Sequence, residues 1–178
     1  MARKSEITDI FLYLQAEENG CTLPGKSAGN RWKDSALKHI SKKHKRKIKE
    51  GREWFENHPK EDVYIKSHDG LNLHAYYLKI DTPSGKIMIM FHGYRSSYKD
   101  FSCAFQYYSS LGFDMLVVDQ RSHGQSEGKI ISYGVKERFD VVSWLEYAKE
   151  RFGEEYSYYL DGKKITPADA MTLLTAYL

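Results

Sequence analysis

The spacing of apolar side chains divides the chain into a helical first part and a mixed second part. Apolar residues recur three and four positions apart over residues 7–14, and again over residues 31–55, which predicts two amphipathic helices. From Asp62 the pattern changes to short apolar runs typical of strands. We therefore expect residues 1–59 to form a helical extension and residues 60–178 to form an α/β domain.

Five short apolar runs in the second part predict five strands. Asp69-Gly70, a dipeptide typical of tight hairpin turns, separates the first two runs. The third run is continuously apolar, as in a parallel strand buried on both faces, and the fourth is predicted to be another buried strand. The runs are residues 63–65, 71–80, 87–91, 113–118 and 156–160, and helical spacing at 100–111 and 135–152 separates the last three. A hairpin followed by alternating strands and helices predicts an α/β sheet with right-handed crossovers.

Polar residues follow the third strand, beginning with His92-Gly93-Tyr94. Ligands of open α/β sheets bind at the carboxyl ends of central strands. Gly93 would permit a sharp turn there, and the backbone amide of Tyr94 could then stabilise an oxyanion, with His92 shaping the loop. An ordinary connection between a strand and a helix is the alternative interpretation.

A second polar loop, from Asp119 to Gly128, follows the fourth strand. It contains an acid, a base and a cation, so an acid–base pair is conceivable. A structural role is favoured: Asp119 would accept backbone N–H groups, Arg121 would pair with a carboxylate, and Gly124 would serve a turn. Under this interpretation His123 also has no direct catalytic role.

These segments together resemble the α/β-hydrolase superfamily, and in particular its serine aminopeptidase-like bacterial hydrolases. The resemblance covers about residues 50–162 and lies in EDVYIKSHDGLNLHAYYL, FHGYRSS, MLVVDQRSHGQSEGK and GVKERFDVVSWLEYAKERFG, in that order. It implies hydrolysis of an ester, amide or thioester through a serine acyl-enzyme, without a cofactor. It also implies that Tyr94 provides one oxyanion-hole amide and that the Asp119–Gly128 loop is mainly structural.

The resemblance ends after Asp161-Gly162. In the family the fifth strand leads into a Gly-x-Ser-x-Gly elbow that carries the nucleophile. Here Lys163-Lys-Ile-Thr-Pro167 follows, and no Gly-x-Ser-x-Gly occurs in the chain. The family's acid and histidine belong to later strands that are absent. We expect a truncated α/β-hydrolase-type sheet that is inactive alone and acts on a small ester or amide only when a missing C-terminal half completes it.

The abruptness of this end favours a changed reading frame or a recombined terminus over a natural short protein. Thr166 to Asp169 fit a helix cap, an acidic first turn and a short helix to Leu178, which argues mildly against a frameshift. The fifth strand, residues 156–160, would lie unpaired at the edge of the sheet. We therefore predict self-association through this strand.

A phosphate-binding loop is the main competing interpretation. Gly20-Cys-Thr-Leu-Pro-Gly25-Lys26-Ser27 matches the Walker A pattern, in which Lys26 would reach the phosphates and Ser27 would hold magnesium. A predicted helix, and not a buried strand, precedes this segment, and Gly29 disfavours a helix after it. An ordinary loop is therefore the favoured interpretation.

Charge and cysteine content add a third possibility and several exclusions. The net charge of +3 depends on six basic residues between Lys42 and Lys49, without which it would be −3. They could make a basic interaction module, but a solvated helix face is favoured and nucleic acid is an unlikely partner. No apolar run approaches membrane-spanning length. Cys21 and Cys103 are expected to be free thiols in a cytoplasmic protein without a metal site.

Overall fold

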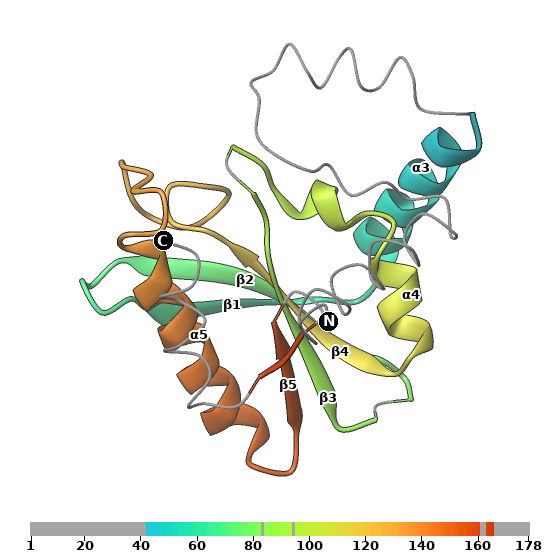
Figure 1. Ribbon diagram of the computed structural model, residues 1–178. Helices are drawn as coiled ribbons and strands as arrows, with labels where there is room; N and C mark the ends of the chain where they lie inside the picture. The colour runs from blue at the N-terminus through green and yellow to red at the C-terminus, as the bar shows by residue number, and fades with distance from the viewer. Residues whose placement is uncertain (1–41, 83, 94, 161–162, 166–178) are drawn as a thin grey trace, which may run out of the picture. The chain divides into compact units, whose positions relative to one another are not determined.

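The computed structural model describes residues 42–82, 84–93, 95–160 and 163–165 (Figure 1). These residues form two compact units. The first contains residues 42–58 and 99–107, and the second contains the rest of the described chain. Several predicted features lie outside the described residues. They are the first predicted helix, Cys21, the loop from Gly20 to Ser27 with Gly25 and Lys26, Tyr94, and residues 166–178.

The second unit is built on one six-stranded mixed sheet in the order β1-β2-β4-β3-β5-β6. β1 pairs antiparallel with β2, and β2 pairs antiparallel with β4, whereas β3 runs parallel to both β4 and β5. The strands are β1 Glu61–Lys66, β2 Asn72–Leu78, β3 Lys86–Phe91, β4 Phe113–Asp119, β5 Ser157–Leu160 and β6 Lys163–Ile165. This arrangement confirms a hairpin followed by parallel strands.

One face of the sheet packs against helix α5, Glu137–Phe152, which is the orange helix to the left of β5 in Figure 1. Trp144, Leu145 and Ala148 of this helix are buried in one cluster with apolar residues from the strands, among them Ile89 and Val118. Every residue of β4 is buried, including Asp114 and Asp119, which confirms the buried strand predicted for residues 113–118. The central strands are thereby held rigidly, and the loops that leave them start from defined positions.

The single helix predicted for residues 100–111 is wrong. The structure has a short 3-10 helix, η1 Tyr98–Phe101, a turn, and then α4 Phe105–Ser110. The Ser102 hydroxyl donates to the Lys99 carbonyl oxygen at 2.6 Å, a local bond that competes with the hydrogen bonds of a continuous helix. Cys103, in this turn, is disulfide-bonded, which corrects the prediction of a free thiol.

The prediction that the fifth strand is left unpaired is also wrong. β6 pairs antiparallel with β5, and Tyr158, Tyr159 and Leu160 lie opposite Ile165, Lys164 and Lys163. The hydrogen-bonding groups on that side of β5 therefore belong to a ladder. Since the family resemblance ends at residue 162, it gave no indication that the next three residues add a strand.

In the first unit, α3 Lys42–Asn57 carries the basic run. Arg46 and Lys49 form exposed ion pairs, one turn along the helix, with Glu50 and Glu53 at 3.2 and 3.5 Å. Phe55 is buried and stacks on Phe105, with ring centroids 4.7 Å apart. Among the described residues, no helix is long and apolar enough to cross a membrane.

The short strand β6 is expected to matter for stability because Ile165 is buried in the same cluster as Trp144. Ile165→Ala should lower the free energy of unfolding by about 2–4 kcal/mol, the usual cost of truncating a buried isoleucine. Urea denaturation measures this change, with exposed Lys129→Ala as the control. Equal stability of the two variants would show that β6 contributes nothing to the core.

Candidate functional site

The candidate site lies where the two predicted polar loops leave β3 and β4. The strands are parallel and in register, with Phe91 opposite Val118, so both loops start at the same end of the sheet. His92 is buried, and its Nε2 accepts the Gln120 backbone N–H at 3.2 Å. The Gln120 side-chain amide donates to the His92 carbonyl oxygen. These contacts join the first residues of the two loops.

His92 and His123 lie close together at this junction, with ring centroids 4.8 Å apart. His123 Nδ1 is 2.9 Å from the Arg121 carbonyl oxygen, and therefore carries the proton and donates it. Its Nε2 is buried and has no hydrogen-bond partner. The His123 ring thus lies close to His92, and among the described residues its Nε2 has no hydrogen-bond partner.

Asp119 joins the end of β4 to the edge hairpin through His74 on β2. His74 is fully buried, and its Nδ1 and Nε2 lie 2.9 Å from the Asp119 and Asp62 carboxylates respectively. Burial lowers the pKa of His74, but the hydrogen bonds to Asp119 and Asp62 outweigh it, so the pKa is raised above its ordinary 6.5. An imidazole hydrogen-bonded on both ring nitrogens to carboxylates ties strand β2 to the loop.

The return of this loop depends on Gly124, which has a φ of +53°. A Cβ at this position would lie 2.0 to 2.4 Å from the Asp119 carboxylate, so no larger residue fits without displacing that group. The next residue, Gln125, donates its backbone N–H to Asp119 at 3.0 Å. Asp119 therefore accepts a backbone N–H, as the sequence suggests, and also a ring N–H from His74, which the sequence does not reveal.

Arg121 makes the most extensive polar contacts of the site. It forms two 2.6 Å hydrogen bonds to Asp140 on α5 and two 3.1 Å bonds to Asp69 in the hairpin turn. The guanidinium holds the pKa of Asp69 well below its usual range. Burial raises the pKa of Asp140, and Arg121 partly offsets that rise. Arg121 thereby connects the loop, the hairpin and the helix.

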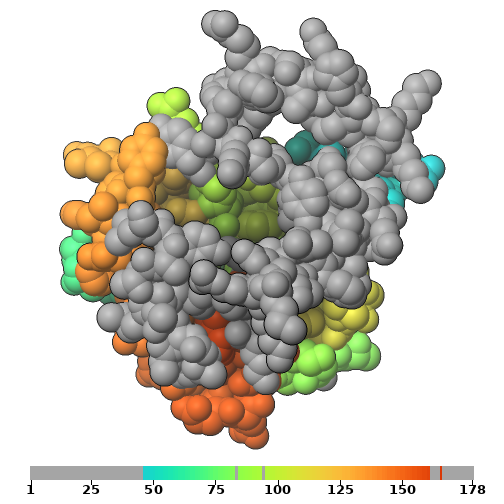
Figure 2. Space-filling view, viewed as in Figure 1, coloured from blue at the N-terminus to red at the C-terminus, as the bar shows by residue number. Residues whose placement is uncertain are grey.

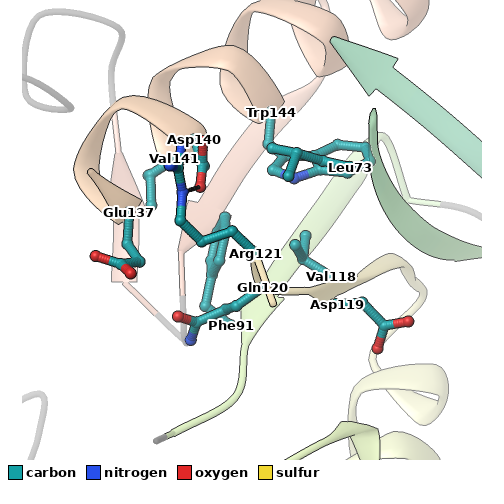
Figure 3. A pocket seen from close by; sticks show the side chains of 10 residues that line it. All are labelled: Leu73, Phe91, Val118, Asp119, Gln120, Arg121, Glu137, Asp140, Val141 and Trp144. Carbon is teal, nitrogen blue, oxygen red and sulfur yellow. Dashed lines mark hydrogen bonds and ion pairs between the residues drawn. The ribbon is translucent and has the colours of Figure 1, made fainter. Parts of the chain in front are cut away.

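A pocket of about 80 Å³ lies between α5 and the carboxyl ends of β3 and β4 (Figure 3). Arg121 extends toward Asp140 along one wall, while the Asp119 side chain points away from Arg121 (Figure 3). The pocket is lined by apolar side chains and by partnered polar ones: Leu73, Phe91, Val118, Asp119, Gln120, Arg121, Glu137, Asp140, Val141 and Trp144.

Next to the pocket, the segment that leads into α5 is exposed. Ile130, Tyr133 and Val135 are at least half exposed, and the orange atoms of this part of the chain form the upper left of the surface in Figure 2. Among the described residues, no group of three histidine, cysteine, aspartate or glutamate side chains has the geometry of a metal site.

Sequence reasoning missed four participants: Asp62, Asp69, His74 and Asp140. Two of them left a usable signal. His74 interrupts an otherwise apolar strand, and Asp140 lies between apolar residues of an amphipathic helix. A charged or polar residue at such a position is expected to have a buried partner.

No family model matches the chain. Over 98 residues it is 35% identical to the uncharacterized protein YqkD of Bacillus subtilis, a match that covers 53% of this chain and 32% of the other. The chain therefore spans about a third of the length of this curated relative.

Solved structures match the same region. The esterase Pf2001 of Pyrococcus furiosus is 27% identical, with a TM-score of 0.52, and the match covers 58% of this chain and 41% of the esterase. An α/β serine hydrolase homologue from Coxiella burnetii is 17% identical, with a TM-score of 0.50. The match covers 56% of this chain and 50% of the homologue. The chain thus contains part of the α/β-hydrolase fold and resembles esterases, as the sequence motifs predict.

The contacts of Arg121 generate a prediction about stability. Arg121→Met leaves the buried Asp140 carboxylate without its partner and should cost about 3–5 kcal/mol of unfolding free energy. Lys136→Met is the matched control because Lys136 makes an exposed 3.3 Å contact to Asp69. Urea denaturation at neutral pH compares the two. A loss for Arg121→Met no larger than for Lys136→Met would contradict the role given to Arg121.

The His74 contacts generate a prediction about pH. Because the folded-state pKa is raised above 6.5, the stability that protonated His74 contributes is complete below that pH and is lost as pH rises through the folded pKa. Asp62→Asn should lower that pKa and flatten this loss, whereas exposed Asp81→Asn should not. NMR titration of the His74 ring follows the pKa directly. Identical titrations in both variants would refute the coupling to Asp62.

Proposed function

We propose that this chain is the part of an esterase-like α/β hydrolase that forms the sheet and one side of the oxyanion hole, and that its 178 residues do not hydrolyse esters by themselves. The observation that carries the proposal is the meeting of the His92-Gly93 and Asp119–Gly128 loops at the carboxyl ends of two parallel strands. The likeness to an esterase over 58% of the chain supports it.

The proposed division of labour follows from acyl-transfer chemistry. Attack on an ester carbonyl creates a negatively charged oxygen, which backbone N–H groups stabilise. The Tyr94 amide is assigned this role, with His92 and Gly93 setting the course of the loop. A supporting role for that loop is assigned to Asp119, Arg121, His123 and Gly124. The polar atoms of Asp119 and Arg121 are already hydrogen-bonded within the protein, to His74, Gln125, Asp140 and Asp69.

The remaining groups must come from elsewhere. The chain has no Gly-x-Ser-x-Gly segment, so it lacks the elbow serine and the second oxyanion amide that follows it. The substrate class by resemblance is an ester, amide or thioester, and binding would require the C-terminal half that completes such a site. Without a nucleophile the oxyanion intermediate does not form, so an oxyanion-hole amide alone gives no hydrolysis.

The chain alone is therefore expected to be inactive. Hydrolysis of short-chain nitrophenyl esters should not exceed that of an unrelated control protein, and a fluorophosphonate probe should label no serine. Mass spectrometry of the probe-treated protein measures the second outcome. Stoichiometric labelling of a single serine, such as Ser96 or Ser97 beside Tyr94, would overturn the proposed division of labour.

A chimera tests the assigned role of Tyr94. Residues after Leu160 are replaced by the part of the Pyrococcus esterase that follows its matching fifth strand, and ester hydrolysis is expected to appear. In that chimera Tyr94→Pro removes the backbone N–H and should lower kcat about 100-fold or more, whereas Tyr94→Ala retains the N–H and should retain activity. Circular dichroism confirms folding, and equal kcat values for the two variants would reject the assignment.

A further inference from the structure

His74 on β2 has a third polar neighbour besides Asp119 and Asp62. The side-chain nitrogen of Gln125, in the Asp119–Gly128 loop, lies 3.3 Å from His74 Nε2. It also lies 3.4 Å from Asp62 Oδ1, the oxygen that is 2.9 Å from the same ring nitrogen. An ionised carboxylate only accepts hydrogen bonds, whereas the nitrogen of an amide only donates them. Two neighbours of opposite kind therefore face one ring nitrogen.

The proton on Nε2 decides which of these neighbours is bonded. With the proton, Nε2 donates to Asp62, and the Gln125 amide must donate elsewhere. Without it, Nε2 has a lone pair, which accepts an N–H from Gln125 and repels the Asp62 carboxylate. The Gln125 nitrogen can make this change with little movement, because its other acceptors, Asp62 and the Tyr76 hydroxyl, lie 3.4 and 3.3 Å away.

The burial of the two carboxylates identifies Nε2, and not Nδ1, as the nitrogen that loses its proton. The Asp119 side chain is 5% exposed, whereas the Asp62 side chain is 57% exposed. Loss of a donor is costly for a buried carboxylate, while an exposed one can turn to water. Neutral His74 therefore keeps its Nδ1 proton, which it donates to Asp119 at 2.9 Å.

The orientation of the Gln125 amide is fixed by its side-chain oxygen. The Tyr64 hydroxyl of β1 donates to Gln125 Oε1 at 2.9 Å, which turns the amide nitrogen toward His74. The opposite orientation would turn the oxygen toward the Asp62 carboxylate, where neither group has a proton to donate. The amide is therefore placed to donate at the ring and not to accept there.

Asp62 and Asp119 are the charged groups that act on the His74 imidazole. The other titratable groups that face it are Tyr64 and Tyr76, whose ring centroids lie 5.0 and 4.5 Å from its own. Phenols are uncharged near neutral pH, so the proton that changes there belongs to the imidazole. Burial lowers the pKa of His74, and the two carboxylates more than offset it, so the exchange of neighbours is expected above pH 6.5.

We propose that His74 Nε2 is a proton-controlled exchange point: the protonated ring bonds Asp62 on β1, and the neutral ring bonds the side-chain amide of Gln125. The bond from Nδ1 to Asp119 persists in both forms. A rise in pH through the titration of His74 thus releases β1 from the ring and gives the Asp119–Gly128 loop a second bond to β2, so the loop stays in place. The exchange needs no hydrolase activity and is independent of the function proposed above.

NMR of the full chain tests the exchange without any substitution. As pH rises through the titration of His74, the Gln125 side-chain N–H resonances should shift with the same midpoint as the ring. The side-chain amide of exposed Gln106 is the control in the same spectrum and should not follow that midpoint. The ring ¹⁵N shifts should show that neutral His74 carries its proton on Nδ1.

Three results of this titration would overturn the proposal. The first is a Gln125 side-chain amide that does not respond to the proton of His74. The second is a neutral ring that carries its proton on Nε2. The third is a ring that does not titrate between about pH 5 and 9, the range in which an accessible change of histidine charge would lie.

Two variants separate the exchange from a merely structural role of Gln125. Gln125→Leu removes the donor to the neutral ring, so the His74 pKa should rise by about 0.4 to 1, the equivalent of one hydrogen bond. Gln106→Leu is the matched control and should leave that pKa unchanged. A His74 pKa that stays the same or falls in Gln125→Leu would contradict the exchange. If Gln125→Leu does not fold, the wild-type titration decides alone.

Hydrogen exchange tests whether the loop stays in place. The Gln125 backbone N–H donates to Asp119 at 3.0 Å and should keep the same protection factor on both sides of the His74 titration. A protection factor that falls above the titration would show that the loop opens as the proton leaves, and the proposed exchange would then be wrong.

Discussion

The guanidinium of Arg121 is the interaction on which the arrangement of the site depends. It bridges Asp140 on α5 and Asp69 in the β1–β2 turn, so three segments distant in sequence share one buried cation. A carboxylate as buried as Asp140 is costly without a counterion. Helix, hairpin and loop must therefore reach their positions together, or the ion pair is not satisfied. The course of the Asp119–Gly128 loop follows from this requirement.

A second network, around His74, acts on the other side of the same loop. Asp119 accepts from the imidazole and from the Gln125 backbone, and the Ser126 hydroxyl accepts the His74 backbone N–H at 2.8 Å. The loop is thus attached to the neighbouring strand β2 by both side-chain and main-chain bonds. Buried networks of this type limit a loop to one conformation when every member is satisfied. That rigidity suits a loop that supports the adjacent His92-Gly93 turn, for which we propose an oxyanion-binding role.

The sequence predicted what local patterns determine, and it failed where distant residues decide. The apolar runs in β3 and β4 and the Asp69-Gly70 turn were sufficient to predict a hairpin and buried parallel strands. The break at Ser102 was not predicted, since one side-chain hydrogen bond competes there with an otherwise regular helical pattern. Arg121 was expected to meet a carboxylate, but Asp140 and Asp69 become its partners only through the tertiary fold. β6 was missed because a three-residue strand has too little pattern of its own.

The antiparallel pairing of β6 also restricts how a second polypeptide could join this sheet. In a sheet that continues with parallel strands, the next strand pairs with the open side of β5, and here Lys163–Ile165 already occupy that side. An incoming strand would have to displace β6 before it could form hydrogen bonds with β5. Assembly in trans would then require the exchange of one paired strand for another. Joining the same segment covalently after β5 avoids that competition, because β6 is then absent.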